Sequence, residues 1–333
     1  MTNLTNPIFH NADAAREHLE AQRWPDGAVC PHCGCVGEDH VTPIKGAFSR
    51  PSAAHPEGVE RKGLYQCNGC RRQFTVTVGT VFERSKVPLN KWLLATYLLT
   101  SSKKGMSAHQ LHRTIGVTYK TAWFMFHRIR EAMKEDGTSG PLGGKGKVIE
   151  ADEMYHGKRD VPYVSPQRKG RPYTKSGKSG GTQKRVIVGL IERGGQTRTF
   201  HVNVATKKTV REILVKNADR KSRLHTDESR LYTTTGQEFA RHQTTNHSAG
   251  EYARGDVNSN SIENVFSIFK RGMIGVYQHC GEAHLQRYLT EFDFRYNRRT
   301  KLGFTDEDRH NALLKMVAGK RLTYRRTGEA ALA

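Results

Sequence analysis

The stretch NSNSIENVFSIFKRGMIGVY, residues 258–277, decides the fold of this chain. Its apolar residues recur every three or four positions, which predicts a helix with one buried face. Lys270 follows Glu263 by seven residues, or two helical turns, so both side chains lie on one side of that helix. The plainer interpretation of Glu263 is a solvated helix residue or the partner of a nearby base.

Two aspartates precede this helix. Asp152 lies in KVIEADEMYHGKR, residues 147–159, and Asp227 lies in RLHTDESRLY, residues 223–232. Carboxylates that converge in a basic protein indicate a divalent-metal site that acts on a polyanion. A strand-end cap or turn acid is the alternative for both aspartates, while Glu150 and Glu153 are weaker candidates beside Asp152.

The composition favours nucleic acid as the partner. The 333 residues include 54 Lys and Arg against 32 Asp and Glu, a net charge of +22 with a pI near 9.9. Such an excess indicates an anionic partner, although a basic protein without one is the alternative. No run of eighteen apolar residues exists and no secretory signal opens the chain, so we expect no membrane contact and a cytoplasmic location.

Four of the six cysteines form two matched pairs, Cys30-Pro-His-Cys33 and Cys67-Asn-Gly-Cys70. Two such pairs predict a tetrahedral thiolate site for structural Zn²⁺ in a zinc ribbon. Tyr65, Phe74, Val76 and Val78 would form its small apolar face, in an alternating pattern after the second pair. The polar segment between the pairs, residues 42–63, is predicted to be a loop. His32, Cys35 and Cys280 are expected not to bind the metal.

A helical segment follows the ribbon. Residues 88–100 predict one apolar helix, Ser107 caps a second, and Thr118 caps a third that runs to about residue 134 after a turn at Gly116. The last two helices match a helix-turn-helix, with an ordinary helical hairpin as the alternative. The core side would hold Ala122, Phe126 and Ile129, and the side predicted to face DNA holds Tyr119, Lys120, His127, Arg128 and Arg130.

The C-terminal half alternates strands and helices after a Gly-rich boundary at residues 135–147. A strand with Asp152, a hairpin, a helix, a short strand ending at Asp227 and the helix with Glu263 follow in that order. This is the order of an α/β RNase H-like domain, in which such acids meet at one end of the sheet and hold two divalent ions. The insert at residues 156–185, with Lys169 and Arg171, is rich in Lys and Arg and could bind phosphate or be solvated.

At this point the chain resembles bacterial insertion-sequence transposases of the DDE class, of the ISXO type, which have a zinc ribbon and a helix-turn-helix ahead of an RNase H-like domain. The similarity rests on the ribbon cysteines, ADEMYHGKR, HTDES and the block from residue 258 to 299, and covers about residues 20–300. It implies Asp152 and Asp227 as the first two ligands of catalytic Mg²⁺ or Mn²⁺. It also implies Lys270 as a contact to the DNA end, with Arg271 beside it.

The third ligand stays open between Asn260 and Glu263, because much of this group is described with an Asn there. The two residues are three positions apart, so their side chains lie on one face of the helix. An anionic oxygen binds a hard cation more strongly than an amide oxygen does, which favours Glu263.

The resemblance implies an enzyme that binds double-stranded DNA, at the terminal inverted repeats and at the target, and that cleaves and transfers strands as a homo-multimer in the bacterial nucleoid. The alternatives are an inactive zinc-ribbon DNA-binding regulator and a nuclease without joining activity. The predicted domains are a zinc ribbon at 1–85, a helix-turn-helix region at 86–140, the catalytic domain at 141–300 and a tail at 301–333.

Overall fold

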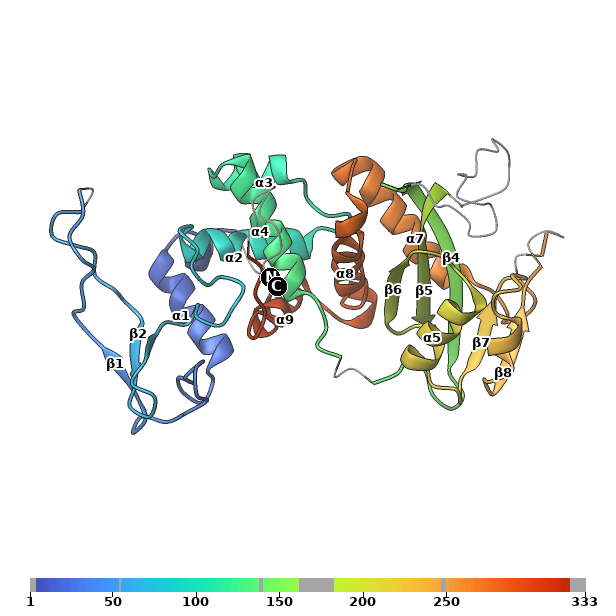
Figure 1. Cartoon of the computed structure of the whole chain (residues 1–333), viewed down its shortest axis with the longest axis horizontal. Helices are drawn as coiled ribbons and strands as arrows, with labels where there is room; N and C mark the ends of the chain where they lie inside the picture. Colours follow the sequence, from blue (N-terminus) through green and yellow to red (C-terminus); the bar gives the residue numbers. More distant parts are fainter. Residues whose placement is uncertain are drawn as a thin grey trace. The chain divides into compact units, whose positions relative to one another are not determined.

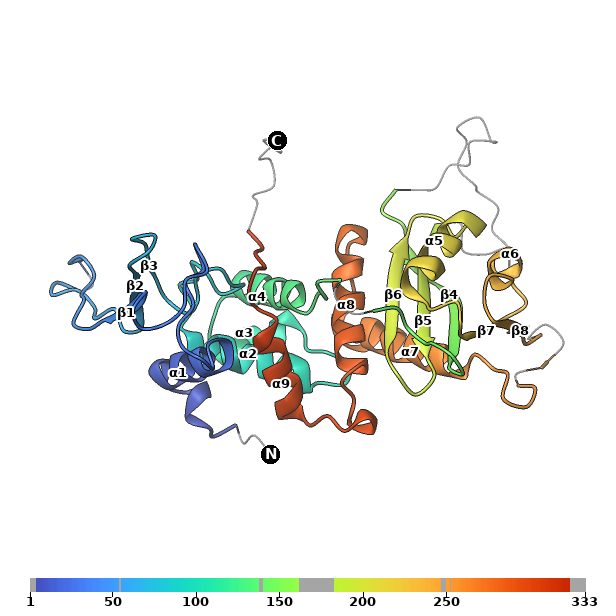
Figure 2. The same cartoon turned by 90° about the horizontal axis from the view of Figure 1, so that it is seen from below.

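The computed structural model describes residues 4–53, 55–137, 140–161, 183–246, 250–251 and 253–323 (Figure 1; a second view in Figure 2). The chain divides into two compact units. Unit 1 comprises Met1–Ser102, Met106–Met133 and Phe304–Ala333, and unit 2 comprises Lys103–Gly105 and Lys134–Gly303. Each unit therefore combines segments that lie far apart in the sequence.

Unit 1 begins with a helix and a small antiparallel sheet. Its elements are η1 (Pro7–Phe9), α1 (Ala12–Arg23), β1 (Val41–Ile44), β2 (Leu64–Cys67), β3 (Gln73–Phe74), α2 (Leu89–Ser101), α3 (Ala108–Ile115), α4 (Tyr119–Ala132) and α9 (Asp306–Lys315). The sheet order is β1-β2-β3. Trp24, at the end of α1, meets the rings of Tyr65 and Phe74 edge-on at 5.5 and 5.9 Å, so the helix and the sheet share one aromatic core.

Helices α3 and α4 have the caps that the sequence predicts. The Ser107 hydroxyl accepts a bond from the Gln110 N–H, and the Thr118 hydroxyl accepts one from Thr121. Gly116 ends α3 with φ of 63°, a left-handed conformation that glycine adopts without strain. The predicted core positions Ala122, Phe126 and Ile129 are buried.

Unit 2 contains a mixed five-stranded sheet and its helices. The elements are β4 (Val148–Lys158), β5 (Lys184–Glu192), β6 (Thr197–Val202), α5 (Lys207–Asn217), β7 (Arg223–Thr226), α6 (Thr233–Gly236), β8 (Arg241–Thr244), α7 (Asn260–Gly272), η5 (Met273–Tyr277), η6 (Glu282–His284), α8 (Leu285–Tyr296) and η7 (Thr300–Leu302). The strand order is β6-β5-β4-β7-β8. The β4–β5 and β5–β6 pairs are antiparallel, whereas β4–β7 and β7–β8 are parallel. The predicted succession of strands and helices is therefore confirmed.

Alternation along the central strands divides the core of unit 2 into two layers. Ile187 and Ile191 of β5 pack with α7 and α8 on one face of the sheet. Val188 and Leu190 of the same strand pack with α5 on the other face (Figures 1 and 2). A strand buried on both faces has such a continuous apolar sequence, here RVIVGLIE.

Gly189 lets α7 approach the sheet closely. It lies opposite Asp152 in the β4–β5 pair. A Cβ atom at this position would lie 2.7 Å from Ile262 Cδ1 and 2.8 Å from the ring of Phe266, both on α7. A larger residue would push α7, and the acid that it carries, away from β4.

Three segments differ from their predicted structure. The predicted loop at residues 42–63 begins within β1, and the alternating pattern after Cys70 forms only the two-residue β3 before turns begin. The segment 301–333 was predicted to be a tail but contains α9. Leu313 and Leu314 of this helix are fully buried, and its His310 ring shares a 2.9 Å hydrogen bond with the Thr96 hydroxyl of α2.

Within the described part of the chain, no helix is long and apolar enough to cross a bilayer.

Candidate catalytic site and zinc site

The predicted zinc ligands converge in unit 1. The sulfur atoms of Cys30, Cys33, Cys67 and Cys70 all lie within 4.8 Å of one another. The Cys30–Cys70 and Cys33–Cys67 separations are 3.7 and 3.5 Å. A tetrahedral zinc ion with Zn–S bonds of about 2.3 Å places its sulfurs about 3.8 Å apart. The four thiols therefore fit one structural Zn²⁺, and Cys35 is not part of the set.

The two predicted aspartates lie on neighbouring parallel strands. Glu150 of β4 is the register partner of His225 of β7. Asp152 and Asp227 each follow this pair by two residues, and side chains two apart point to the same side of a strand. Strand β7 ends at Thr226, so Asp227 lies just beyond its carboxyl end.

Asp152 lies in a crowded acidic environment. Burial, as the largest cause, and the neighbouring carboxylates of Asp227, Glu153 and Glu263 together raise the pKa of its carboxyl to about 8. The backbone N–H of Glu153 donates to Asp152 Oδ1 at 2.7 Å and partly opposes this rise in pKa. Acids from β4, the end of β7 and α7 thus act on one carboxyl, and we name Asp152, Asp227 and Glu263 the acid cluster.

Glu153 is turned toward other partners. Its two carboxylate oxygens accept hydrogen bonds from the hydroxyls of Tyr232, at 2.7 Å, and Ser229, at 3.2 Å. Tyr232 is fully buried in the α5-side core. Glu153 therefore connects β4 to the segment that follows Asp227, and its oxygens are less available to a ligand than those of Asp152.

Both candidates for the third acidic position lie in the first turn of α7. Asn260 begins the helix and Glu263 follows three residues later, and both side chains are exposed. Glu263 accepts a 2.9 Å hydrogen bond from the Ser259 hydroxyl and contributes to the raised pKa of Asp152. The choice between Asn260 and Glu263 stays a prediction.

A basic residue completes the exposed side of α7. Lys270 is exposed. The pKa of His156 on β4 is lowered first by burial, then by the charge of Arg185 and then by the charge of Lys270. Arg271 is exposed beside it and donates to the Ser267 carbonyl at 3.3 Å. The helix therefore presents an acid near Asp152 and two cations further along.

The residues predicted to face DNA in α4 divide into two classes. Tyr119 is 44 % exposed and stacks on His109 with ring centroids 4.1 Å apart, and Lys120 is exposed. The prediction for Arg128 needs correction, because this side chain is buried. Its guanidinium donates to the Glu83 carbonyl at 2.7 Å and lies 5.3 Å from the Trp92 ring centroid, so it stabilises the core of unit 1.

Other predicted contacts need the same distinction. His127 and Arg130 were also predicted to face DNA, but both are buried. The apolar spacing of α4 does not reveal how much of the helix surface other elements cover. Lys169 and Arg171 fall in residues 162–182, outside the described residues.

A divalent cation fits the acid cluster by its chemistry. Mg²⁺ and Mn²⁺ prefer carboxylate oxygens, and a cation would relieve the repulsion that raises the pKa of Asp152. In the part of the chain that the structure describes, only the cysteine set brings three or more ligand atoms within 4.8 Å of one another. The acids of a two-ion site need not all touch one ion.

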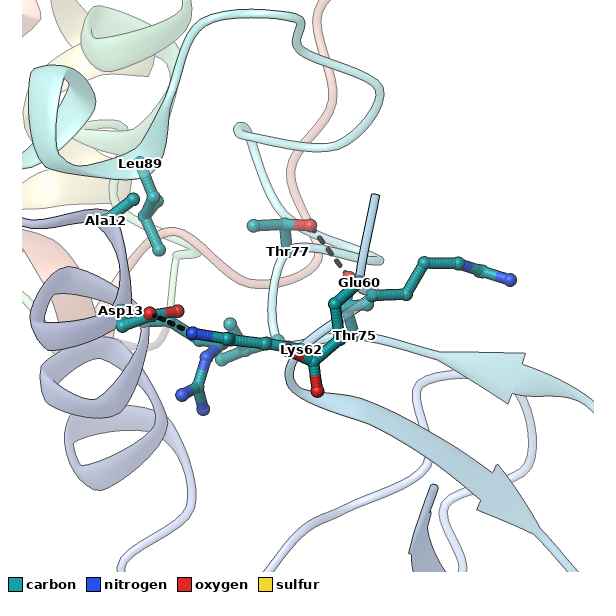
Figure 3. A pocket seen from close by; sticks show the side chains of 10 residues that line it. Ala12, Asp13, Glu60, Lys62, Thr75, Thr77 and Leu89 are labelled. Carbon is teal, nitrogen blue, oxygen red and sulfur yellow. Dashed lines mark hydrogen bonds and ion pairs between the residues drawn. The ribbon is translucent and has the colours of Figure 1, made fainter. Parts of the chain in front are cut away.

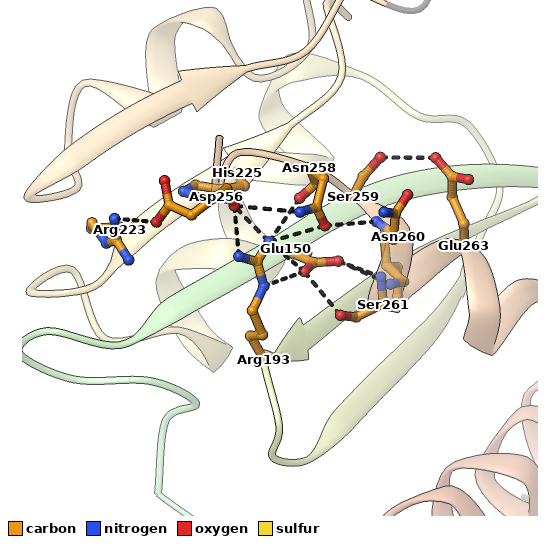
Figure 4. Close-up of polar contacts among 11 residues, drawn as sticks. Glu150, Arg193, Arg223, His225, Asp256, Asn258, Ser259, Asn260, Ser261 and Glu263 are labelled. Atoms are coloured by element: carbon orange, nitrogen blue, oxygen red, sulfur yellow. Dashed lines mark hydrogen bonds and ion pairs between the residues drawn. The ribbon is translucent and has the colours of Figure 1, made fainter. Parts of the chain in front are cut away.

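Sequence reasoning missed two features near the acids. Tyr155 on β4 is 40 % exposed, and burial together with Glu153, Asp152 and Asp227 raises its pKa. Glu150, treated in the sequence as a weak candidate ligand, is fully buried and bonded to Arg193 and to α7 (Figure 4). A glutamate inside the apolar run VIEA was the available signal, since a buried charge requires a partner.

An open groove of 540 Å³ lies between α1 and the ribbon in unit 1 (Figure 3). Two of the three cations that line it, Arg16 and Lys62, already have acidic partners. Lys62 Nζ lies 2.7 Å from Asp13, and Arg16 pairs with Glu17 and Glu20 at 3.0 and 3.1 Å. The charges of Arg16 and Lys62 are therefore compensated within unit 1, which makes these two side chains poor phosphate ligands.

Two protein families match the chain. The ISXO2-like transposase domain matches residues 141–297, and the transposase zinc-ribbon domain matches residues 10–73. The chain is also 28% identical over 298 residues to an uncharacterized protein in the transposable element ISH50 of Halobacterium salinarum. This similarity covers 86% of the chain and 91% of the relative.

Solved structures of Mos1 complexes are more distant. The Mos1 strand transfer complex has a TM-score of 0.22 and 13% identity, covering 66% of this chain and 80% of the Mos1 chain. The Mos1 mariner paired end complex with Mn has a TM-score of 0.20 and 11% identity, covering 60% and 74%. The mixed α/β fold of unit 2 is assigned from the strand order β6-β5-β4-β7-β8.

Proposed function

Because the chain carries the transposase and zinc-ribbon domains of an IS1595-type transposase, we propose that it cleaves DNA at the ends of an insertion sequence and joins those ends to a target. The observation that carries this proposal is the acid cluster, in which burial and the carboxylates from β4, the end of β7 and α7 together raise the pKa of Asp152 to about 8. Such crowding of like charges is typical of a functional site.

In this proposal Asp152, Asp227 and Glu263 hold divalent ions at the scissile phosphate. Bound Mg²⁺ or Mn²⁺ supplies Lewis acidity toward that phosphate and toward the attacking and leaving oxygens. Lys270 binds a phosphate of the reacting strand from the exposed side of α7. Hydrolysis would break the P–O3′ bond at the element end and expose a 3′-hydroxyl. This hydroxyl would then attack a target phosphodiester, form a new P–O bond and displace the 3′-oxygen of the target strand as a hydroxyl.

Recognition of the ends is assigned to unit 1. Helices α3 and α4 would act as a helix-turn-helix, with the exposed Tyr119 and Lys120 at the start of α4 as contacts to DNA. The ribbon would add contacts to the terminal inverted repeats. Two ends must be brought together for joining, so we propose a homo-multimer on double-stranded DNA.

The test is a cleavage and joining assay with DNA from both ends of the element and with Mg²⁺ or Mn²⁺. Asp152→Asn and Asp227→Asn should each lower cleavage by about three orders of magnitude or more while end binding stays near wild type. Glu238→Gln is a matched control, since Glu238 is an acid of unit 2 paired with Arg211 at 2.6 Å. Wild-type cleavage by either aspartate variant would refute the mechanism.

The same assay separates the alternatives. Cleavage without joined product would identify a nuclease. End binding without cleavage by the wild-type chain, under every metal condition, would identify a DNA-binding regulator.

A further inference from the structure

One arginine contacts all three segments that carry the acid cluster. Arg193 lies in the β5–β6 turn, and its backbone N–H donates to the Val148 carbonyl of β4 at 2.9 Å. Its guanidinium bonds Glu150 of β4 at 2.8 Å and reaches His225 Nδ1 of β7 at 3.4 Å. It also donates to three acceptors in the segment before α7: the carbonyls of Asp256, at 2.7 Å, and Asn258, at 3.1 Å, and the Asn258 side chain, at 3.2 Å (Figure 4).

Glu150 connects the same strand to the start of α7. Its carboxylate accepts the backbone N–H groups of Ser261, at 2.7 Å, and Ile262, at 3.1 Å, as well as the Ser261 hydroxyl at 3.0 Å (Figure 4). The N-cap residue of α7, Ser259, makes no side-chain capping bond. A carboxylate from a strand 111 residues earlier therefore caps the helix that carries Asn260 and Glu263.

The spacing of this network matches the spacing of the acids. Glu150 and His225 are register partners, and Asp152 and Asp227 follow them by two residues each. Two residues of strand correspond to about 7 Å. Glu263 lies one to two residues beyond the two N–H groups that Glu150 binds. The contacts of Glu150 and Arg193 thus fix each acid-bearing segment close to its acid.

We propose that Glu150 and Arg193 form a positioning pair that sets the mutual placement of Asp152, Asp227 and Glu263 for divalent-ion binding. This inference rests on the proposed function, because it gives the pair a role in that metal site. Glu150 is fully buried and its carboxylate oxygens are bonded to Arg193 and α7, so it acts through the acids and does not touch DNA or metal. The fork of Arg193 can reach several acceptors at once, which a lysine cannot do.

The experiment compares matched substitutions in the full-length, zinc-loaded chain. Glu150→Gln and Arg193→Lys alter the pair. Glu238→Gln and Arg211→Lys are the controls, because Arg211 and Glu238 form an ion pair of unit 2 at 2.6 Å that is separate from the contacts of Glu150 and Arg193. Mn²⁺ binding is measured by calorimetry without DNA, and kcat and KM for end cleavage are measured over a range of Mn²⁺ concentrations.

We expect Glu150→Gln to weaken Mn²⁺ binding and to lower kcat by about 10- to 100-fold each, as is usual for residues that orient metal ligands. KM for DNA should stay within about two-fold of wild type, since no contact to DNA is lost. Arg193→Lys should lie between Glu150→Gln and wild type, and both controls should match wild type. A loss of stability alone would lower the active fraction without changing Mn²⁺ affinity.

Wild-type Mn²⁺ affinity in both Glu150→Gln and Arg193→Lys would overturn the positioning role. If Glu150→Gln does not fold, Arg193→Lys alone decides. Asp152→Asn tests the premise separately. If Asp152→Asn keeps wild-type Mn²⁺ affinity and cleavage, the proposed function fails. If Asp152→Asn loses both while Glu150→Gln keeps both, the proposed function stands and only the positioning role is refuted.

Discussion

At the scale of single residues, the environment of Asp152 has consequences for stability as well as for metal binding. Its pKa is raised from 3.8 to about 8, with burial as the largest cause. A folded-state pKa above the unfolded value means that the folded chain loses stability as pH rises from about 4 to about 8. Asn at this position keeps the shape and cannot ionise.

Asp152→Asn should therefore stabilise unit 2 when no divalent ion is added. The gain should be roughly 2 kcal/mol at pH 7, less than the full shift implies because neighbouring groups relax. It should vanish below about pH 4, where both proteins are neutral at this position. Urea unfolding followed by circular dichroism from pH 4 to pH 8 measures the difference. A gain that does not depend on pH would contradict the assigned cause.

The third acidic position yields a second prediction at the residue scale. If Glu263 is a ligand, Glu263→Gln should lower the cleavage rate by roughly two orders of magnitude or more, because a neutral amide binds a hard cation weakly. Asn260→Ala should then be much milder. Both positions lie in the first turn of α7, so each variant is the control for the other in a metal-dependent cleavage assay. The reverse ranking would assign the ligand to Asn260.

How far the sequence reached at this scale depended on the range of the interactions. Asp152, Asp227 and Glu263 belong to local patterns, and in the structure Asp227 and Glu263 add to the effect of burial in raising the pKa of Asp152. The partners of Glu150 depend on strand register and on a turn 43 residues away, which local spacing does not encode. Arg128 was predicted to lie on the DNA-facing side of α4, but its guanidinium is buried. It can be buried because it donates to the Glu83 carbonyl and lies over the Trp92 ring.

At the scale of elements, the zinc ribbon tests the role of the cysteine set. Cys67→Ser should release zinc and unfold the ribbon, since the sheet β1-β2-β3 is too small to be stable without its metal. Unit 2 should keep its structure. Cys35→Ser is the matched control, because Cys35 lies outside the four-sulfur set and should keep one Zn²⁺ per chain. Metal analysis of the purified proteins gives the answer, and zinc retained by Cys67→Ser would remove the assignment.

Helix α4 provides the second test at this scale. Lys120→Ala should weaken binding to DNA and reduce the slope of log affinity against log salt by about one, as expected for the loss of one phosphate contact. Lys315→Ala removes the same charge from the exposed side of α9 and should leave the slope nearly unchanged. Titrations of end DNA at several salt concentrations measure both slopes. Equal changes in the two variants would indicate a general charge effect without a specific contact by α4.

The elements that the sequence predicted well have strong local signals. The caps Ser107 and Thr118 and the turn at Gly116 set the limits of α3 and α4. The continuous apolar run of β5 and the apolar spacing of α7 gave equally strong signals in unit 2. Strand β8 and helix α6 are only four residues long each, too short for a periodic pattern to identify them.

At the scale of the whole molecule, unit 1 is closed by residues from the far end of the chain. Helix α9 packs on α2, and its Leu313 and Leu314 are fully buried. The Thr80–Ala318 bridge adds a backbone contact. The sequence predicted a tail here because α9 has a short apolar run and begins with three acids. The apolar residues of α2 need a covering helix. No local pattern in the sequence shows that this helix comes from a segment more than 200 residues later.

This arrangement predicts that two equivalent core substitutions affect different units. Leu313 on α9 and Leu214 on α5 are both fully buried, so each Leu→Ala change should destabilise its own unit by about 2–5 kcal/mol. The three tryptophans, Trp24, Trp92 and Trp123, all belong to unit 1, so their fluorescence reports that unit alone. Leu313→Ala should shift the fluorescence transition in urea and spare part of the circular dichroism transition, whereas Leu214→Ala should do the opposite. Leu313→Ala with an unchanged fluorescence midpoint would mean that α9 is not part of the unit that holds the ribbon and α2.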